Sequence, residues 1–180
     1  MMRFYISVIA IFALIFTANA QKSDFYQSFE PLEKGKDITK LKKGKFGTWG
    51  KSTWTVTEKK GKGNNKSDKF ASSNGAINAT LVHYKTLEVG VTYVFSVAVK
   101  MTHAKGNVKK TNYSVKATSG KKGNTHKYGE VKVVEPGENK WKQHTIEFTV
   151  VKGREKVTLQ VYRWAEGVIL NVDDFKLIKK

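Results

Sequence analysis

Alternating apolar and polar residues near the C-terminus could form a surface that binds sugar rings. In residues 157–164, apolar side chains alternate with Thr158, Gln160, Tyr162 and Trp164. In a β-strand this alternation places the polar and aromatic side chains on one face and the apolar ones on the other. Aromatic rings stack on the C–H faces of sugars, while a few polar groups bind the hydroxyls. The pattern therefore predicts a ligand-binding face on a half-buried strand.

The candidate ligand-binding residues extend beyond this strand. They share an aromatic ring or a long hydrogen-bonding side chain, and they are Trp164, Tyr162, Gln160, Arg163, Trp49, Trp54 and Tyr113. Trp49 and Trp54 differ by an odd number of positions, so in one strand they would face opposite ways. We expect one of them to lie in the core and the other to be exposed.

Three acidic residues are candidates for a structural metal site. Glu30 lies in the first expected strand, and Asp173 and Asp174 lie in the last. If the two strands meet in space, their carboxylate oxygens would suit Ca²⁺, with backbone carbonyls completing the shell. The apolar residues change parity at the two aspartates, which predicts a β-bulge there. The alternative is a pair of exposed acids at a turn beside lysines.

The chain lacks the common catalytic motifs. It has no cysteine, no Gly-x-Ser-x-Gly and no Walker loop, and its four histidines lack metal-ligand spacing. The obvious carboxylate pair for glycoside hydrolysis is already assigned to a metal site. A non-catalytic protein is therefore the favoured interpretation, although a lyase that uses Tyr, His, Lys or Arg stays open.

Short β-strands must position these residues. The clearest spans residues 91–101, where apolar side chains occupy every second position, including Tyr93 and Phe95, which we expect in the core. Further strands are expected at 24–30, 49–57, 76–84, 113–117, 131–134, 145–150, 157–164 and 168–177. About eight or nine short strands predict an all-β protein, an antiparallel β-sandwich. Residues 59–69 have no apolar side chain and are expected to form a loop without an anchor.

Four segments also follow one another in the order known from one group of binding modules. They are residues 27–30 (QSFE), 87–100 (LEVGVTYVFSVAVK), Trp141 with the strand after it, and 172–177 (VDDFKL). This order resembles the jelly-roll carbohydrate-binding modules of the family four, nine and twenty-two type. The resemblance implies a jelly-roll sandwich that binds polysaccharide and holds a structural calcium near the acidic candidates. The chain departs from these modules in having Gln27 where Asn-Gly is usual, and in its high lysine content.

The N-terminus has the features of a secretory signal peptide. Arg3 precedes an apolar run at residues 4–16, and Ala18-Asn19-Ala20 is a small-residue cleavage sequence. We expect residues 1–20 to be the signal and residues 21–180 to form a single domain. The apolar run is too short to span a bilayer, so no transmembrane segment is expected after cleavage. The predicted location is secreted, periplasmic or cell-surface.

The chain is strongly basic, with a formal net charge of +18 that comes almost entirely from lysine. Such a charge can simply serve solubility. Outside the cytoplasm, however, the charge favours a polyanionic partner, and the leading candidate is an acidic polysaccharide. Lysine suits diffuse attraction, whereas arginine makes the bidentate contacts of specific readout. We therefore predict a monomeric module that binds an acidic or sulfated glycan and no specific nucleic acid. A polysaccharide lyase and a cationic envelope or adhesion protein are the alternatives.

Overall fold

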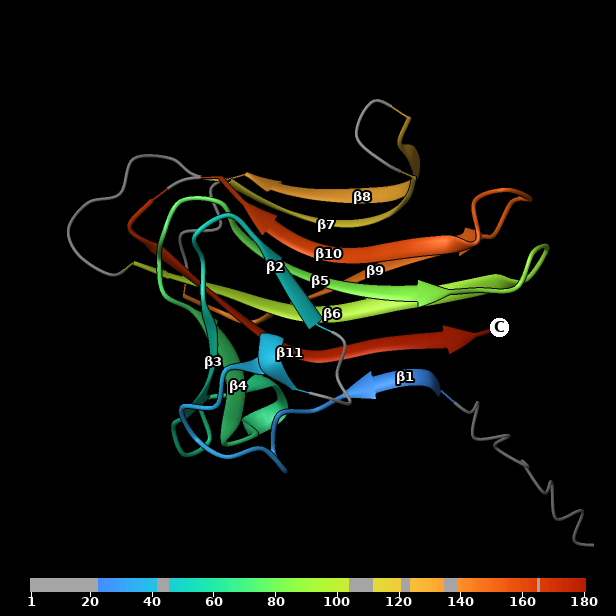
Figure 1. The fold of residues 1–180 in the computed structure, drawn as a ribbon. Helices are drawn as coiled ribbons and strands as arrows, with labels where there is room; N and C mark the ends of the chain where they lie inside the picture. The colour runs from blue at the N-terminus through green and yellow to red at the C-terminus, as the bar shows by residue number, and fades with distance from the viewer. Residues whose placement is uncertain (1–22, 42–45, 104–111, 121–123, 135–138, 165) are drawn as a thin grey trace, which may run out of the picture.

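Two antiparallel β-sheets pack face to face (Figure 1). The computed structural model describes residues 23–41, 46–103, 112–120, 124–134, 139–164 and 166–180. Sheet A contains, in order, β3 (Trp54–Glu58), β4 (Lys69–Ser73), β11 (Val168–Lys179), β6 (Thr92–His103) and β9 (Lys142–Thr149), and β1 (Ser23–Gln27) pairs with β11. Sheet B contains, in order, β2 (Phe46–Trp49), β5 (Ala79–Thr86), β10 (Lys156–Arg163), β7 (Asn112–Ser119) and β8 (His126–Val134). The β-sandwich predicted from the sequence is confirmed.

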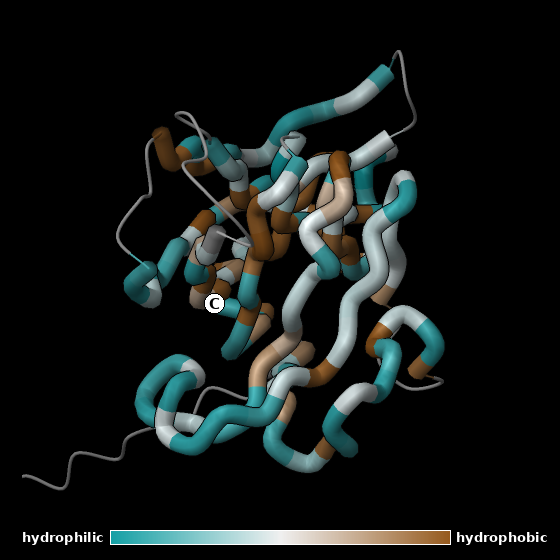
Figure 2. Tube along the Cα trace, turned by 90° about the vertical axis from the view of Figure 1, so that its left-hand side faces the viewer, coloured by the Kyte–Doolittle hydropathy of each residue, from teal (hydrophilic) through white to brown (hydrophobic). Residues whose placement is uncertain are grey.

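The hydrophobic core lies between the two sheets and follows the predicted period-two rows. Tyr93 and Phe95 of β6 are buried there, as predicted, and Leu159 and Val161 of β10 face them from sheet B. Figure 2 shows the hydrophobic residues gathered inside the molecule and the hydrophilic ones on the outer loops. Burying one face of each strand in this way leaves the opposite face of each sheet free for function.

One expected strand is in fact two. Residues 49–57 were predicted as a single strand, but the chain leaves sheet B after Trp49 and enters sheet A at Trp54. Gly50, with φ +78°, opens the turn between them. This left-handed conformation favours glycine, which has no Cβ to clash. The turn therefore sends the two tryptophans to different sheets.

The predicted β-bulge in the last strand is confirmed. The pairing of β11 with β6 shifts register between Asp173 and Lys176. Asp174 adopts φ 47°, and the buried apolar row changes parity from Val172 to Phe175. The bulge turns both aspartates away from the core toward the segment that precedes β4.

Two short 3-10 helices complete the described elements, η1 (Ile38–Lys40) and η2 (Asn64–Lys66). The second lies within residues 59–68, so this stretch is a loop, as predicted. The proposed signal peptide lies outside the described residues. Within the described part of the chain, no helix is long and apolar enough to cross a membrane.

Candidate functional site

The outer face of sheet B gathers most of the candidate ligand-binding side chains. Residues paired across antiparallel strands share a face. Trp49 pairs with Thr80, and Thr80 pairs with Tyr162, which places an aromatic residue on each side of Thr80 in one row. Gln160 lies in the next row, paired with Lys116 of β7. We call this surface the aromatic face, and it consists of Trp49, Thr80, Tyr84, Lys116, Thr158, Gln160, Tyr162 and Trp164.

Trp49 and Tyr84 form a hydrogen-bonded pair on the aromatic face. The Trp49 indole Nε1 donates to the Tyr84 hydroxyl over 2.9 Å. Gly47 lies close to the Tyr84 ring, since a Cβ on this glycine would come within 3.4 Å of a ring carbon. Trp49 is still 46% exposed and Tyr84 48% exposed. The pair therefore presents two aromatic rings to solvent in a defined relative position.

A lysine and a glutamate bring charge to the edge of this face. Lys116 Nζ lies 3.1 Å from a carboxylate oxygen of Glu130 and 5.4 Å from the centre of the Tyr162 ring. Although burial raises the pKa of Glu130, hydrogen bonds and charges from Lys116 and a hydrogen bond from Lys127 hold this pKa below its ordinary value. Burial raises the pKa of Tyr162, so its hydroxyl is a neutral hydrogen-bond donor at physiological pH.

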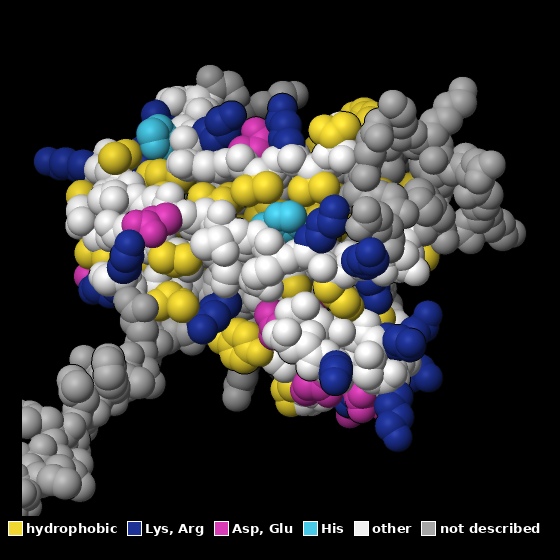
Figure 3. Space-filling view, turned by 180° about the vertical axis from the view of Figure 1, so that it is seen from behind, with side chains coloured by type: hydrophobic (Ala, Val, Ile, Leu, Met, Phe, Trp, Pro, Cys, Tyr) yellow, Lys and Arg dark blue, Asp and Glu magenta, His cyan; other side chains and the backbone are white. Residues whose placement is uncertain are grey.

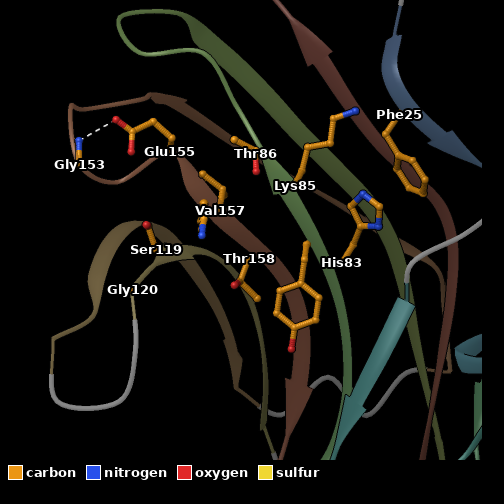
Figure 4. Close-up of a pocket in the computed structure, with 12 residues that line it drawn as sticks. Phe25, His83, Lys85, Thr86, Ser119, Gly120, Gly153, Glu155, Val157 and Thr158 are labelled. Carbon is orange, nitrogen blue, oxygen red and sulfur yellow. Dashed lines mark hydrogen bonds between the residues drawn. The ribbon is translucent and has the colours of Figure 1, made fainter.

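Two hollows lie at opposite ends of β5 and β10. The smaller, of about 410 Å³, is lined by Trp49, Gly50, Asn78, Thr80, Lys116, Gln160, Tyr162 and Trp164. The larger, of about 960 Å³, begins at Tyr84 and Thr158. Figure 4 shows Thr158 and Ser119 on one side of this larger hollow and Phe25 and His83 on the other. The aromatic face thus runs from one hollow to the next along the two strands.

Three candidate residues are buried, which corrects the expectation that they contact a ligand. Trp54 is 0% exposed, and its Nε1 donates to a backbone carbonyl of β5. The Tyr113 hydroxyl lies 2.7 Å from His144 Nε2, inside the molecule. Arg163 is also fully buried, and its Nη2 donates to a backbone carbonyl. Each of the three belongs to the apolar row of its strand, and that row faces the other sheet.

The other four candidates lie together on the aromatic face. Trp164 follows the end of β10 and is 61% exposed. Tyr162 and Gln160 share the outer side of β10, although Gln160 is buried because β5 and β7 flank it. Trp49 joins them from β2. The expectation that one of Trp49 and Trp54 is core and the other exposed is confirmed.

The aspartates at the bulge bind the loop of residues 59–68. Asp173 Oδ2 accepts hydrogen bonds from Asn64 N at 3.0 Å and from Ser67 Oγ at 2.7 Å. Asp174 Oδ2 accepts from Asn64 Nδ2 at 2.7 Å. Burial raises the pKa of Asp173 to about 6. The two carboxylates therefore tie this loop to the last strand.

Glu30 binds the C-terminal end of the same loop, next to the residues that the aspartates bind. Its Oε1 accepts from the backbone N–H groups of Asp68 and Lys69, at 2.6 and 3.0 Å. The three acidic candidates thus meet at one loop, although Glu30 lies in the turn after β1 and not in the first strand as expected. We call these hydrogen bonds of Glu30, Asp173 and Asp174 the loop clasp.

A calcium ion at the loop clasp would have to replace some of these hydrogen bonds. Several of its carboxylate oxygens accept N–H or O–H donors, whereas Ca²⁺ needs six to eight oxygen ligands. The described part of the chain also contains no group of three or more His, Cys, Asp or Glu side chains that could hold a metal ion. Calcium binding at Glu30, Asp173 and Asp174 stays a prediction.

Tyr84 and Lys116 belong to the aromatic face but were not among the binding candidates from the sequence. The sequence does contain a signal for Tyr84. Thr80, Val82 and Tyr84 occupy every second position of an expected strand, so they share one face of it. Lys116 carries no such signal, because its neighbour Tyr162 is distant in sequence and meets it through strand pairing.

The comparisons with known proteins concern the fold. The sequence matches no protein-family model and no curated protein. The CBM22-1 xylan-binding domain of Paenibacillus barcinonensis Xyn10C has a similar structure, with a TM-score of 0.64 at 14% identity over 90% of this chain and 97% of that chain. The C-terminal family 22 carbohydrate-binding module of Clostridium thermocellum Xyn10B gives 0.62 at 15% identity over 89% and 95%.

A larger solved chain matches in part. The Clostridium thermocellum Xyn10B chain that holds CBM22-1 and GH10 modules gives a TM-score of 0.63 at 18% identity over 89% of this chain. The match covers only 29% of the Xyn10B chain, so this protein corresponds to less than a third of its length. TmCBM61, solved with β-1,4-galactotriose, gives 0.52 at 16% identity over 81% of this chain. At these identities the likeness establishes the fold, that of jelly-roll carbohydrate-binding modules.

Proposed function

We propose that the protein is a secreted, non-catalytic and monomeric module that binds a polysaccharide along the aromatic face of sheet B. The observation that carries the proposal is the cluster of Trp49, Tyr84, Tyr162 and Trp164 beside Gln160. Solved proteins that share the fold are described as xylan-binding or were solved with a galactotriose, which supports a glycan ligand.

The geometry suggests how a sugar chain would be held. The exposed rings of Trp49, Tyr84 and Trp164 would stack on the C–H faces of successive sugars. Gln160 and Tyr162, which line the smaller hollow, would exchange hydrogen bonds with sugar hydroxyls. Stacking costs little entropy because the Trp49 and Tyr84 rings are already held by their mutual hydrogen bond.

We further propose that the glycan is acidic or sulfated. Lys116 lines the smaller hollow beside Tyr162, where its ammonium, which also pairs with Glu130, could donate a hydrogen bond to a carboxylate or sulfate of the ligand. The formal net charge of +18 would add long-range attraction to any polyanion.

The test is to truncate the exposed rings one at a time. Trp49→Ala and Trp164→Ala should each weaken glycan binding by about 1–2 kcal/mol, roughly five- to thirtyfold, as truncated aromatic anchors commonly do. Isothermal titration with alginate, sulfated and xylan oligosaccharides measures the change. Tyr26→Ala is the matched control, because Tyr26 is an exposed aromatic residue of sheet A. Unchanged affinity in both tryptophan variants would remove the aromatic face as the site.

A further inference from the structure

The outer face of sheet A carries a polar groove of about 610 Å³, away from the aromatic face of sheet B. Its floor is formed by side chains of β3, β4, β6 and β11, among them Thr55, Ser72, Thr102 and Asn171. The register of the strands places Thr55, Ser72 and Asn171 in one row across the sheet. Three lysines, Lys59, Lys62 and Lys100, line the same groove. We call it the lysine groove.

The loop that supplies two of these lysines is fixed in place. The Lys62 carbonyl accepts from Lys100 Nζ at 3.0 Å and from Trp141 Nε1 at 2.8 Å. The loop clasp holds the far side of the same loop. Lys59 and Lys62 are thus attached to a backbone that is already positioned over the sheet. Figure 3 shows Lys and Arg side chains in dark blue, together with some Asp and Glu side chains in magenta, on the lobe that carries β3 and β4.

Lys100 is the central cation of the groove. Its Nζ lies 4.7 Å from the Trp141 ring centre and 5.0 Å from the Phe70 ring centre. An ammonium has three N–H donors, and the contacts described for Lys100 use one of them, to the Lys62 carbonyl. Burial, followed by the charges of Lys59 and Lys62, lowers the pKa of Lys100. Donors and positive charge are therefore left for a ligand.

No acid offsets this charge among the described residues of the groove, because its lining contains no Asp or Glu. Asp173 lies on the same sheet face, but the loop covers it, and its oxygens already accept from Asn64, Ser67 and its own neighbour. The floor adds a further donor, since Thr102 Oγ1 accepts from Asn171 Nδ2 and can direct its own proton to a ligand.

We propose that the lysine groove binds a compact oxyanion, either a free inorganic ion or the charged group of an acidic glycan. Lys59, Lys62 and Lys100 would neutralise the charge, and the free N–H donors of Lys100 with the Thr102 hydroxyl would bind its oxygens. Such charge-assisted hydrogen bonds are short and strong. The groove does not share a residue with the aromatic face, so either site can exist without the other.

The first experiment titrates ¹⁵N-labelled protein with sodium sulfate against sodium chloride of equal ionic strength. The indole N–H resonance of Trp141, assigned with Trp141→Phe, should shift saturably with sulfate, because this group shares the Lys62 carbonyl with Lys100. Lys100→Met combined with Lys59→Gln should weaken sulfate binding at least about tenfold. Lys152→Gln is the control, because Lys152 is exposed and outside the groove.

Two variants keep this test decisive. If Lys100→Met impairs folding, as judged by the melting temperature, Lys59→Gln alone should still weaken sulfate binding, because Lys59 is exposed and outside the core. Equal sulfate affinity in wild type and in every folded lysine variant would overturn the proposal, as would the absence of a saturable Trp141 shift with any anion tested.

A second arm identifies the source of the oxyanion. A sulfated oligosaccharide that shifts Trp141 and competes with sulfate, while its desulfated form does neither, supports a glycan-borne group. A shift with inorganic sulfate alone supports a free ion. A neutral oligosaccharide should move the indole resonances of Trp49 and Trp164 and leave Trp141 unmoved. If the aromatic face does not bind glycan, the Trp49 and Trp164 resonances stay unmoved. If the lysine groove does not bind an oxyanion, the Trp141 resonance stays unmoved. The two proposals can therefore fail separately.

Discussion

At the scale of single residues, exposed and buried aromatic side chains should respond differently to truncation. Trp49 is exposed and bonds Tyr84, whereas Trp54 fills the core between the sheets. Trp54→Ala should lower the free energy of unfolding by about 3–5 kcal/mol, because it leaves a cavity. Trp49→Ala should cost far less stability while weakening glycan binding. Urea unfolding and glycan titration on the same two proteins measure both effects, and a large stability loss in Trp49→Ala would contradict the assignment.

Asp173 should give stability a distinctive pH dependence in calcium-free buffer. Burial raises the pKa of this carboxyl to about 6 in the folded protein, above its ordinary value near 4. Because the pKa is higher in the folded state, protonated Asp173 stabilises the folded protein relative to the unfolded one. This contribution to the free energy of unfolding is present below about pH 4 and is lost as the pH rises to about 6. Asp173→Asn should remove that loss. Unfolding curves of the wild type and of Asp173→Asn between about pH 4 and 7 give the difference in their free energies of unfolding. The lowered pKa of Glu130 gives stability the opposite pH dependence, but both proteins share this contribution, so it cancels in the difference.

Calcium should reverse this behaviour if the sequence-based prediction holds. A cation bound by Glu30 and Asp173 would favour the ionised carboxyl and stabilise the folded state by mass action. The melting temperature at neutral pH should then rise with added Ca²⁺ and fall with EDTA. Identical melting curves under both conditions, with no metal in the purified protein, would argue that the loop clasp works through hydrogen bonds alone.

At the scale of elements, the loop of residues 59–68 is held by side chains from the first and last parts of the chain. Without an apolar anchor, its position depends on the loop clasp and on the Lys62 carbonyl contacts. Backbone N–H groups that bond carboxylates are stronger anchors than neutral pairs. The loop clasp therefore also positions Lys59 and Lys62 at the lysine groove.

Glu30→Ala should release one end of this loop. The backbone N–H groups of Asp68 and Lys69 would lose their acceptor, at a cost of about 1 kcal/mol or less because the contacts are exposed. Trypsin should then cut first and faster between residues 59 and 66, as mass spectrometry of early digests would show. Glu33→Ala, at an exposed acid near Glu30, is the control and should digest like the wild type. Equal cleavage in all three proteins would contradict this role of Glu30.

At the scale of the whole molecule, the net charge of +18 should govern the salt dependence of binding. Affinity for alginate or a sulfated glycan should fall steeply between about 50 and 200 mM salt, because counterion release contributes to the driving force. Affinity for a neutral glycan held by ring stacking should barely change. Titration of both ligands at the two salt concentrations provides the measurement. Equal insensitivity to salt would leave a neutral-glycan module whose lysines serve solubility.

The sequence by itself determined the sandwich, the core rows and the bulge at Asp173. These features follow from the side-chain period of a strand, which is a local property that a single chain segment displays. The same period placed Gln160, Tyr162 and Trp164 on one side of their strand. It also required Trp49 and Trp54 to differ in burial, without saying which one is buried.

Only the tertiary structure decided which residues meet. Gly50 sends Trp54 into the core of the sandwich and leaves Trp49 beside Tyr84. Arg163 and Tyr113 prove to be buried because their rows face the other sheet. The loop clasp and the lysine groove join residues that are distant in the sequence. Strand order and register bring these groups together, and both depend on pairing between distant segments that a local alternation pattern does not specify.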